Sequence, residues 1–331
     1  MSGRIRIAQY GTRHGHAEGK LTDIRTNPHV ELAGVYEPDP TRRAELAHTA
    51  GYAGIPWFDH AAQMLDDPTI VAVAAEGRND ESLDHVAQII AAGKHVWYDK
   101  PAGENWQQWQ DLAAAAQRQQ LLIQMGYMFR YHAGFRRIEQ LVRSGALGTI
   151  FSIRAHMSTW LPPAARAVIA VHQGGILYDL AGHMLDQIVW LLGRPQQVDG
   201  FLQTSDPASP AGFADNTLAV LRYPRAMALI DIAACEIPPP ARRFEVYGSH
   251  GSVIMEPFEP AGALRLCLAT HGGTSADIQS IAVEQQSRQQ LYDRELAAFI
   301  ATLYGEQPPD RPLAHELLVQ ETLLRATGTL T

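Results

Sequence analysis

Short apolar runs and longer helical patterns alternate along the first part of the chain. The runs that fit buried strands are Ile5–Tyr10, Glu31–Tyr36, Ile70–Ala75, His95–Tyr98 and Leu121–Gln124. Helix-like segments between them include Thr41–Thr49, Glu81–Ala92 and Asn105–Arg118. Gly93 follows the second of these, where a left-handed cap would end a helix. This alternation predicts βαβ units and hence an α/β fold with a doubly wound parallel sheet.

After about residue 150 the pattern changes to short strands that follow one another across tight turns. The expected strands are Asn216–Arg222, Ala226–Ala234, Arg243–Tyr247 and Ser252–Met255. They predict a largely antiparallel sheet. We expect a helix over Phe135–Arg143 to join the two parts, and a surface loop over the Pro/Ala-rich segment Trp160–Ala170. A length of 331 residues is typical of two domains.

Charge and composition narrow the class of partner. The formal net charge is -8 and the pI is about 5.9, so the chain lacks the excess of basic residues that binding to a phosphate backbone needs. Cys235 and Cys267 are the two cysteines, too few for a disulfide framework and without metal-ligand spacing. No apolar run approaches the length of a bilayer span. We therefore expect a cytoplasmic protein that binds neither nucleic acid nor membrane.

The first expected strand leads into Gly11-Thr12-Arg13-His14-Gly15-His16-Ala17. A dinucleotide-binding turn has the pattern G-x-G-x-x-G here, so that the backbone can approach a pyrophosphate at a helix N-terminus. Only Gly11 is in register, and a simple tight turn also explains it. Glu37 ends the next strand, where an acidic residue would bind an adenosine ribose and repel a 2′-phosphate, which favours NAD. A solvated carboxylate is the alternative interpretation of Glu37.

The segment Val96-Trp97-Tyr98-Asp99-Lys100-Pro101 places a lysine between a strand and a proline. Proline fixes its own backbone and restricts the residue before it, so Lys100 leaves the strand end along one path. The carboxyl ends of parallel strands face the ligand crevice of a doubly wound sheet. Lys100 is therefore a candidate for proton transfer to or from a reacting oxygen. A salt bridge to a neighbouring carboxylate is the alternative.

A second polar group lies on an apolar helical segment that follows Gly174-Gly175. Asp179, His183 and Asp186 have the spacing i, i+4 and i+7, which places them on one helix face. An aspartate one turn from a histidine can orient it and raise its basicity, as acid–base chemistry requires. A solvated helix face is one alternative. A metal site is another and ranks lower, because one helix alone would leave the ligand shell incomplete.

Together these motifs resemble the Gfo/Idh/MocA family of NAD(P)-dependent oxidoreductases. Asp99-Lys100-Pro101 is similar to the family's Glu-Lys-Pro motif, and the helix with Asp179, His183 and Asp186 is similar to its D-x-x-x-H-x-x-D helix. The late hairpin Val246-Tyr247-Gly248-Ser249-His250-Gly251-Ser252 adds a third similarity. The resemblance covers nearly the whole chain.

The resemblance implies an NAD(P)-binding Rossmann domain over residues 1–125. It also implies a substrate-binding and oligomerisation α/β domain, with an open and mostly antiparallel sheet, over residues 126–331. The implied cofactor is NAD, with NADP possible, and the implied partners are a polyol or sugar substrate and a second copy of the chain in a dimer or tetramer. The implied reaction is hydride transfer between the cofactor and a secondary alcohol of a sugar, cyclitol or related polyol. Elimination or glycoside cleavage without net redox, and a non-catalytic NAD or metabolite sensor, are the alternatives.

The resemblance also assigns residues to the site. The implied catalytic residues are Lys100, Asp179 and His183. The implied cofactor-binding residues are Gly11, Thr12, Arg13, His14, Glu37, Glu76, Gly77, Arg78, Asp99 and Lys100. The implied substrate-binding residues are Lys100, Arg130, Asp179 and His183, and no metal site is implied.

The chain departs from the family pattern in three places. Arg13 and His16 stand where the second and third glycines of the phosphate loop would be. The family's Thr-Pro turn after the third expected strand, which counts as the fourth strand of the family's sheet, is replaced by Glu76-Gly77-Arg78-Asn79-Asp80. The family's Gly-Phe-Asn-x-Arg pattern becomes Gly126-Tyr127-Met128-Phe129-Arg130, which keeps Gly126 and Arg130.

Overall fold

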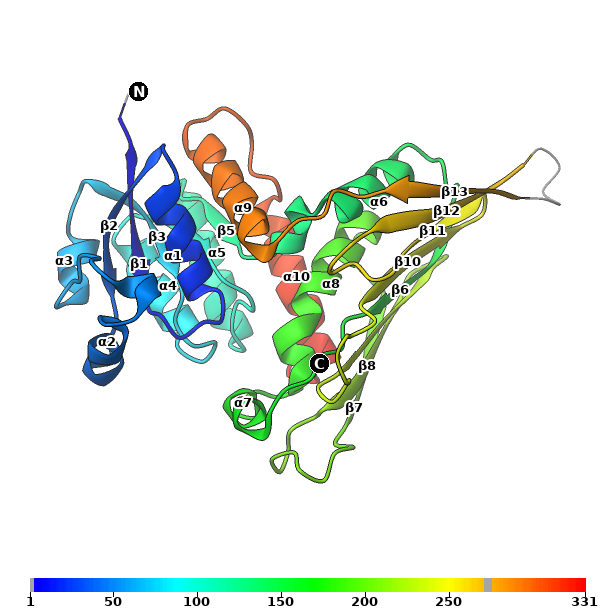
Figure 1. Cartoon of the computed structure of the whole chain (residues 1–331), viewed down its shortest axis with the longest axis horizontal. Helices are drawn as coiled ribbons and strands as arrows, with labels where there is room; N and C mark the ends of the chain where they lie inside the picture. The colour runs from blue at the N-terminus through cyan, green and yellow to red at the C-terminus, as the bar shows by residue number, and fades with distance from the viewer. Residues whose placement is uncertain (1–2, 271–275) are drawn as a thin grey trace. The chain divides into compact units, whose positions relative to one another are not determined.

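The computed structural model describes residues 3–270 and 276–331, which form two compact units (Figure 1). Unit 1 contains the residues up to Met128 together with Arg288–Leu317. Unit 2 contains Phe129–Ser287 and Leu318–Thr331. Each unit has its own sheet and is described by itself.

Unit 1 is built on a 5-stranded sheet in the order β2-β1-β3-β4-β5. The strands are β1 (Ile5–Tyr10), β2 (Val30–Tyr36), β3 (Ile70–Ala75), β4 (His95–Tyr98) and β5 (Ile123–Met125). All four pairings are parallel, which confirms the expected doubly wound sheet. The chain passes from β1 to β2 on one side and then crosses back to β3 on the other side of β1, so the edge above β1 and β3 is a topological switch point.

Helices cover both faces of this sheet. They are α1 (Ala17–Thr26), α2 (Pro40–Leu46), η1 (Ala50–Tyr52), α3 (Ala61–Leu65), α4 (Ser82–Ala91), α5 (Trp106–Arg118) and α9 (Arg288–Leu303). Alternate residues of β4 face opposite helices, as the pleat requires. Trp97 packs beside Phe299 of α9, whereas Tyr98 contacts Trp109 of α5 and donates a hydrogen bond to Ser82 of α4. Gly93 has φ +71° just after α4, as its predicted role as a left-handed cap requires.

Helix α9 belongs to unit 1 although it lies late in the chain. Its residues Leu296, Phe299 and Ile300 pack into the core formed by Ile5, Ile7, Ala72, Ala74 and Trp97. A single division near residue 125 implied that residues 288–317 belong to the second domain. The structure places them in unit 1 instead. The reason is that one face of the parallel sheet needs an apolar cover, and α9 supplies it.

Unit 2 contains an 8-stranded sheet in the order β13-β12-β11-β10-β6-β9-β8-β7. The strands are β6 (Ile150–His156), β7 (Gln197–Gln203), β8 (Asn216–Arg222), β9 (Met227–Ala233), β10 (Arg243–Gly248), β11 (Gly251–Met255), β12 (Ala263–Ala269) and β13 (Ala276–Ala282). Only the pairing of β6 with β9 is parallel among these strands, so the sheet is mostly antiparallel as expected.

The helical elements assigned wholly or partly to unit 2 are η2 (Met128–Tyr131), α6 (Ala133–Arg143), α7 (Pro163–Ile169), α8 (Ile176–Leu192) and α10 (Leu313–Ala326), of which η2 and α10 cross the division between the units. Helix α8 packs on β8 and β9, and α6 packs on α8. The expectation of a loop over Trp160–Ala170 is wrong in part, because Pro163 starts the short helix α7. Proline is well suited to the first turn of a helix, where its missing N–H group leaves no intrahelical bond unmade.

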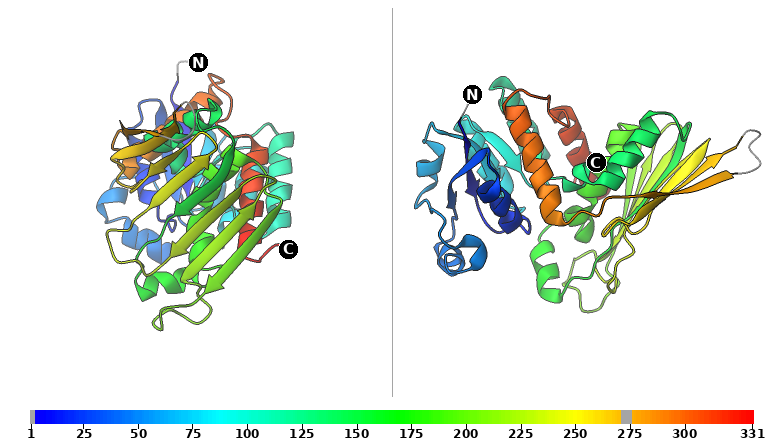
Figure 2. Two further views of the ribbon diagram at one scale, coloured as in Figure 1. Left: turned by 90° about the vertical axis from the view of Figure 1, so that its right-hand side faces the viewer. Right: turned by 45° about the horizontal axis from the view of Figure 1, so that its top comes forward.

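The face of the unit 2 sheet that α8 does not cover is open, and Figure 2 (left) shows it toward the viewer. Strand register places the exposed side chains of Phe201, Met227 and Ile278 on this face. Across the described part of the chain, no helix is both long enough and apolar enough to cross a membrane.

Candidate functional site

Five polar side chains meet at the carboxyl ends of β3 and β4 in unit 1. They are His14 and His16 from the loop after β1, Lys20 from α1, Glu76 directly after β3 and Asp99 directly after β4. We call this group the strand-end cluster. Backbone bonds join the end of β3 to the end of β1 and to the loop after it, since the N–H of Glu76 donates to Tyr10 O at 2.8 Å and the N–H of His14 donates to Glu76 O at 3.0 Å.

Asp99 is the centre of the strand-end cluster. Its Oδ2 lies 3.1 Å from Nδ1 of His14, 2.9 Å from Nδ1 of His16 and 3.0 Å from Nζ of Lys20. Gly126 covers this group, because a Cβ atom there would lie 2.7 Å from Oδ1 of Asp99 and 3.0 Å from the ammonium of Lys20. The retained glycine therefore makes room for buried charge.

The shared carboxylate gives the two histidines opposite protonation. Burial disfavours the charged form of His14, but the charges of Asp99 and Glu76 outweigh it and raise its pKa to about 9. Burial lowers the pKa of His16 to about 4, because Asp99 cannot compensate and the charge on His14 opposes a second cation. Asp99 keeps a pKa well below the ordinary value despite its burial, since His14, His16 and Lys20 all favour its ionised form.

The backbone of Lys100 is held at both ends. Its N–H donates to Oδ1 of Asp99 at 2.7 Å, and its carbonyl lies 3.1 Å from Nε2 of His14. The residue as a whole is 4% exposed. The strand-end cluster thus fixes the main chain that carries the expected catalytic lysine, independently of where its side chain reaches.

The loop after β1 makes a close turn against the loop after β3. Gly11 has φ +82°, and a Cβ atom there would lie 2.7 Å from the backbone nitrogen of Gly77, so only glycine allows this close turn at the switch point. The loop then runs into α1, whose first turn carries the positive end of the helix dipole. Gly11 and Gly77 are both expected cofactor-binding residues, and the structure brings them into contact.

The end of β2 is suited to a ribose rather than to a further phosphate. The carboxylate of Glu37 is buried and accepts hydrogen bonds from Oγ1 of Thr12 at 2.5 Å and from the N–H of Asp39 at 3.1 Å. Nearby guanidinium groups are engaged elsewhere: Arg13 pairs with Asp39, and Arg42 donates to both Oγ1 and the carbonyl of Thr12 at 2.7 Å. The fixed negative charge of Glu37 would repel a 2′-phosphate.

The charged loop after β3 divides into an inner and an outer part. Glu76 is fully buried in the strand-end cluster, and burial together with the charge of Asp99 raises its pKa although Lys20 and His14 oppose this. Arg78 is half-exposed and pairs with Asp80 at 2.5 Å. Of these two expected cofactor-binding residues, only Glu76 joins the cluster.

In unit 2, the segment with Asp179, His183 and Asp186 forms the helix α8 as predicted. Gly174 and Gly175 before it have φ +93° and +53°. A Cβ atom on Gly175 would lie 2.5 Å from the carbonyl oxygen of Ala214, so the close approach that these glycines allow is made by the chain itself.

The polar face of α8 is buried around an ion pair. Nε and Nη2 of Arg130 donate to Asp186 at 3.0 and 2.7 Å, and Gln187 also donates to Asp186. His183 is 2% exposed and its ring stands edge-on to Phe129, with the ring centroids 5.2 Å apart. The solvated-face alternative is therefore wrong for His183 and Asp186, whereas Asp179 is partly exposed.

The sequence analysis did not assign two members of the strand-end cluster to the site, Lys20 and His16, and it named His16 only as a departure from the glycine pattern. For Lys20 a signal was present, because α1 buries Ala17, Leu21 and Ile24 on one face and Lys20 lies on that same face. A lysine in an apolar stripe must find a buried partner or lose its charge.

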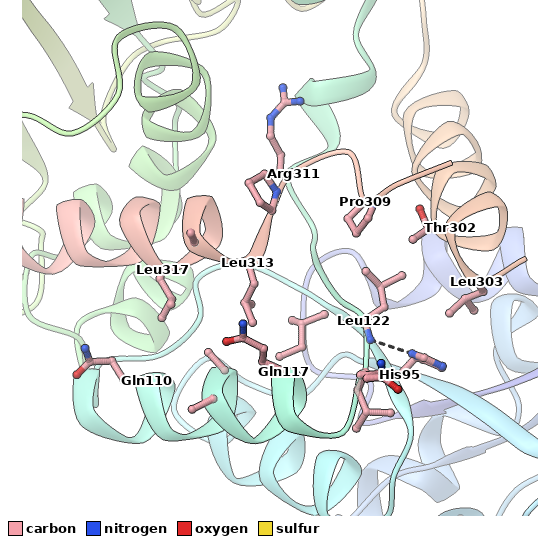
Figure 3. Close-up of a pocket in the computed structure, with 17 residues that line it drawn as sticks. His95, Gln110, Gln117, Leu122, Thr302, Leu303, Pro309, Arg311, Leu313 and Leu317 are labelled. Carbon is pink, nitrogen blue, oxygen red and sulfur yellow. Dashed lines mark hydrogen bonds between the residues drawn. The ribbon is translucent and has the colours of Figure 1, made fainter. Parts of the chain in front are cut away.

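A separate cavity of about 850 Å³ in unit 1 lies away from these residues (Figure 3). Apolar side chains such as Leu122, Leu303, Leu313 and Leu317 line much of it, and His95 at the start of β4 accepts a hydrogen bond from the N–H of Leu122 at 2.9 Å. His95 marks the amino end of β4, opposite to Asp99. The cavity holds none of the expected site residues and does not carry the chemistry.

Comparison with known families gives two matches that follow one another along the chain. A sequence model described as "Oxidoreductase family, NAD-binding Rossmann fold" matches residues 5–127. A model of the Gfo/Idh/MocA C-terminal domain matches residues 135–254. The two matches belong to one family and cover most of the described chain in the order of its two sheets.

Individual relatives agree with these matches. The chain is 26% identical to the uncharacterized oxidoreductase YdgJ of Escherichia coli over 267 residues, which cover 78% of this chain and 73% of that protein. It is 29% identical to inositol 2-dehydrogenase 3 of Saccharopolyspora erythraea over 175 residues, covering 52% of this chain and 48% of that protein. The structure of a levoglucosan dehydrogenase in complex with NADH and levoglucosan superimposes with a TM-score of 0.85 at 16% identity, covering 98% of this chain and 97% of the other, which shows a shared fold.

Proposed function

The chain belongs to the Gfo/Idh/MocA family of oxidoreductases with an NAD-binding Rossmann fold, and we propose that it oxidises a secondary alcohol of a sugar, cyclitol or related polyol. Relatives named as inositol and levoglucosan dehydrogenases support this class of substrate. NAD, when bound, would supply the hydride acceptor and donor, and the protein would supply orientation and proton transfer.

The way the strand-end cluster holds Lys100 is the observation that carries the proposal. Asp99 and His14 bind the N–H and the carbonyl of Lys100, so its side chain starts from a fixed point at the carboxyl edge of a parallel sheet. That edge is where doubly wound sheets bind their ligands. In the proposed reaction, Lys100 hydrogen-bonds the reacting oxygen of the substrate and donates or withdraws a proton there.

His183 is the second proton-handling group in the proposal. It accepts or relays the hydroxyl proton, and Asp179, one turn earlier on α8, orients its ring. The pairing of Asp186 with Arg130 supports a structural role for Asp186. The proposal also assigns Arg130 a contact with the substrate, although its Nε and Nη2 bind Asp186.

A screen of polyols, sugars and sugar acids with NAD and NADP tests the proposal through the absorbance of the reduced nicotinamide. The protein is first checked for retained cofactor. Net reduction of NAD by a polyol is expected, and His183→Ala and Asp179→Asn should both lower turnover while cofactor affinity stays nearly unchanged. Product formation without net reduction would favour elimination or glycoside cleavage, and binding without any turnover would favour a sensor.

We also propose that the chain forms a homo-oligomer through the open face of the unit 2 sheet. Phe201, Met227 and Ile278 are 58%, 53% and 65% exposed there, and large exposed apolar groups on one face mark interaction surfaces. Light scattering should give a multiple of 36.4 kDa. Met227→Asp should shift the protein toward the monomer, and a monomeric unmodified protein would contradict the proposal.

A further inference from the structure

Lys20 is a fully buried lysine that the proposed reaction does not use. Its Nζ lies 3.0 Å from Oδ2 of Asp99, 3.0 Å from Oε1 of Glu76 and 4.4 Å from the centre of the Trp97 ring. Burial disfavours its charge, but Asp99, Glu76 and Glu295 of α9 outweigh burial and raise its pKa. The ammonium is therefore a permanent cation between two carboxylates.

The two carboxylates lead to different parts of the site. Glu76 is joined to the loop after β1, because its carbonyl accepts a hydrogen bond from the N–H of His14 at 3.0 Å. Asp99 is joined to the catalytic segment, because its Oδ1 accepts a hydrogen bond from the N–H of Lys100 at 2.7 Å. One ammonium thus links the loop that holds the cofactor with the main chain of Lys100.

We propose that Lys20 is a positioning residue that keeps the cofactor loop and the backbone of Lys100 in one arrangement. The proposal rests on the proposed function, in which Lys100 acts on the substrate at the bound nicotinamide. Lys20 touches neither reactant in this role and acts through Glu76 and Asp99. A displacement of about 1 Å at a reacting group can cost about 10²-fold in rate, so a link of this kind has a measurable effect.

A metal ion is the rival source of positive charge. Ligand atoms of His14, His16 and Asp99 lie within 4.8 Å of one another, a spacing that a divalent ion could use. However, Lys20 already supplies a cation 3.0 Å from Asp99, and a metal ion would have to share that carboxylate with it. We therefore assign the structural cation of the cluster to Lys20.

Unit 1 offers a matched control at the other edge of its sheet. Lys94 is also a buried lysine, 4% exposed, and its ammonium donates to the carbonyls of Asp67 and Ile70 at 2.8 Å. These carbonyls lie at the amino end of β3, away from the cofactor loop. Lys94→Met therefore removes a buried ammonium from the same sheet without touching the strand-end cluster.

The experiment compares Lys20→Met, the double variant Lys20→Met with Glu76→Gln, and Lys94→Met. The double variant removes the ammonium of Lys20 together with the Glu76 carboxyl group that it faces, so the link is lost without leaving that carboxyl group unpaired. Thermal unfolding, the Kd for NAD by calorimetry, and kcat and KM are measured for each. NAD binding needs no turnover, so this readout stands apart from activity.

We expect the double variant to recover most of the melting temperature that Lys20→Met loses. Its Kd for NAD should stay at least about tenfold weaker, and its kcat about 10²-fold lower, than in the unmodified enzyme. Lys94→Met should lower the melting temperature with NAD affinity and kcat unchanged. If Lys20→Met does not fold, the double variant alone carries the comparison.

Two outcomes would overturn the proposal. A double variant with normal NAD affinity and kcat would make Lys20 only a neutraliser of buried charge. Activity of the unmodified enzyme that a chelator removes and Zn²⁺ restores would make a metal ion the cation of the cluster. A fully active Lys100→Ala enzyme would instead sink the proposed function, and the NAD affinities of the Lys20 variants would still show whether the link shapes the cofactor loop.

Discussion

The strand-end cluster of unit 1 and the ion pair of unit 2 both keep charges away from water, but they balance them differently. In unit 1 one carboxylate, Asp99, is shared by His14, His16 and Lys20. In unit 2 the carboxylate of Asp186 accepts hydrogen bonds from two nitrogens of the Arg130 guanidinium and from Gln187.

The difference follows from where the groups come from. Asp99 lies at the end of a parallel strand, where loops from several strands converge and can each add a partner. Asp186 lies within a helix, where the planar fork of one arginine meets its carboxylate through two nitrogens. In a shared network, replacing one member alters the hydrogen bonds of the others. In the ion pair of Arg130 and Asp186, a replacement mainly affects the partner residue. Function should therefore depend on the first, and stability mainly on the second.

The largest effect is expected at Lys100, which the shared network holds. Lys100→Ala should lower turnover by about 10² to 10⁴-fold. It should leave the melting temperature and NAD affinity nearly unchanged, because the hydrogen bonds from Asp99 and His14 go to its backbone. Lys100→Arg should rescue little, since a guanidinium does not release its proton. Kinetics and thermal unfolding of both variants check this. Recovery of activity in the arginine variant would favour a simple salt-bridge role.

Replacing a member of the ion pair of Arg130 and Asp186 should instead lower stability more than turnover. Asp186→Ala leaves the buried guanidinium of Arg130 without its carboxylate and should lower the free energy of unfolding by about 3 to 5 kcal/mol. Replacing both residues, by Asp186→Leu with Arg130→Met, should restore most of this stability. Denaturant unfolding measures both variants. A stable double variant with a raised KM would show that Arg130 also binds substrate. The ion pair would then have a role in function as well as in stability.

A smaller effect is expected at Glu37, which accepts hydrogen bonds at the end of β2. The enzyme should bind NAD at least about tenfold more tightly than NADP, because a like charge placed at a buried carboxylate is unfavourable by several kcal/mol. Glu37→Gln should narrow the preference. Calorimetry with both cofactors decides this. Equal Kd values for the unmodified protein would mean that guanidinium groups such as Arg42 reorient toward the phosphate.

The last prediction concerns how the free energy of unfolding depends on pH, which changes gradually with each pH unit. The pKa of His14 is about 9 in the folded chain, against about 6.5 for an ordinary histidine. Between these values the folded state holds a proton that the unfolded state has lost. The contribution of His14 is therefore complete below about pH 6.5 and falls by about 1.4 kcal/mol per pH unit up to about pH 9. Unfolding at pH 7 and 9, with His14→Gln as the control, should show a decrease that the variant lacks.

The spacing of apolar residues along the sequence was enough to predict strands of both sheets. Four expected strands have the predicted bounds, namely Ile5–Tyr10, Ile70–Ala75, His95–Tyr98 and Asn216–Arg222. The three in the first sheet were recognisable because a buried parallel strand is a continuous apolar run between breaks. The same reasoning placed Asp179, His183 and Asp186 on one helix, since a spacing of i, i+4 and i+7 is a property of the chain alone. The motifs around Lys100 and this helix also pointed to the family that the comparisons found.

The tertiary structure alone decided which distant groups meet. The sequence analysis did not single out Lys20, whose partners Glu76 and Asp99 follow two other strands. It likewise could not show that α9 covers the first sheet, because its apolar side chains would suit either unit. Periodicity records which residues are buried, whereas the partner of a buried charge is set by strand order and crossover, which bring together segments that are far apart in the chain.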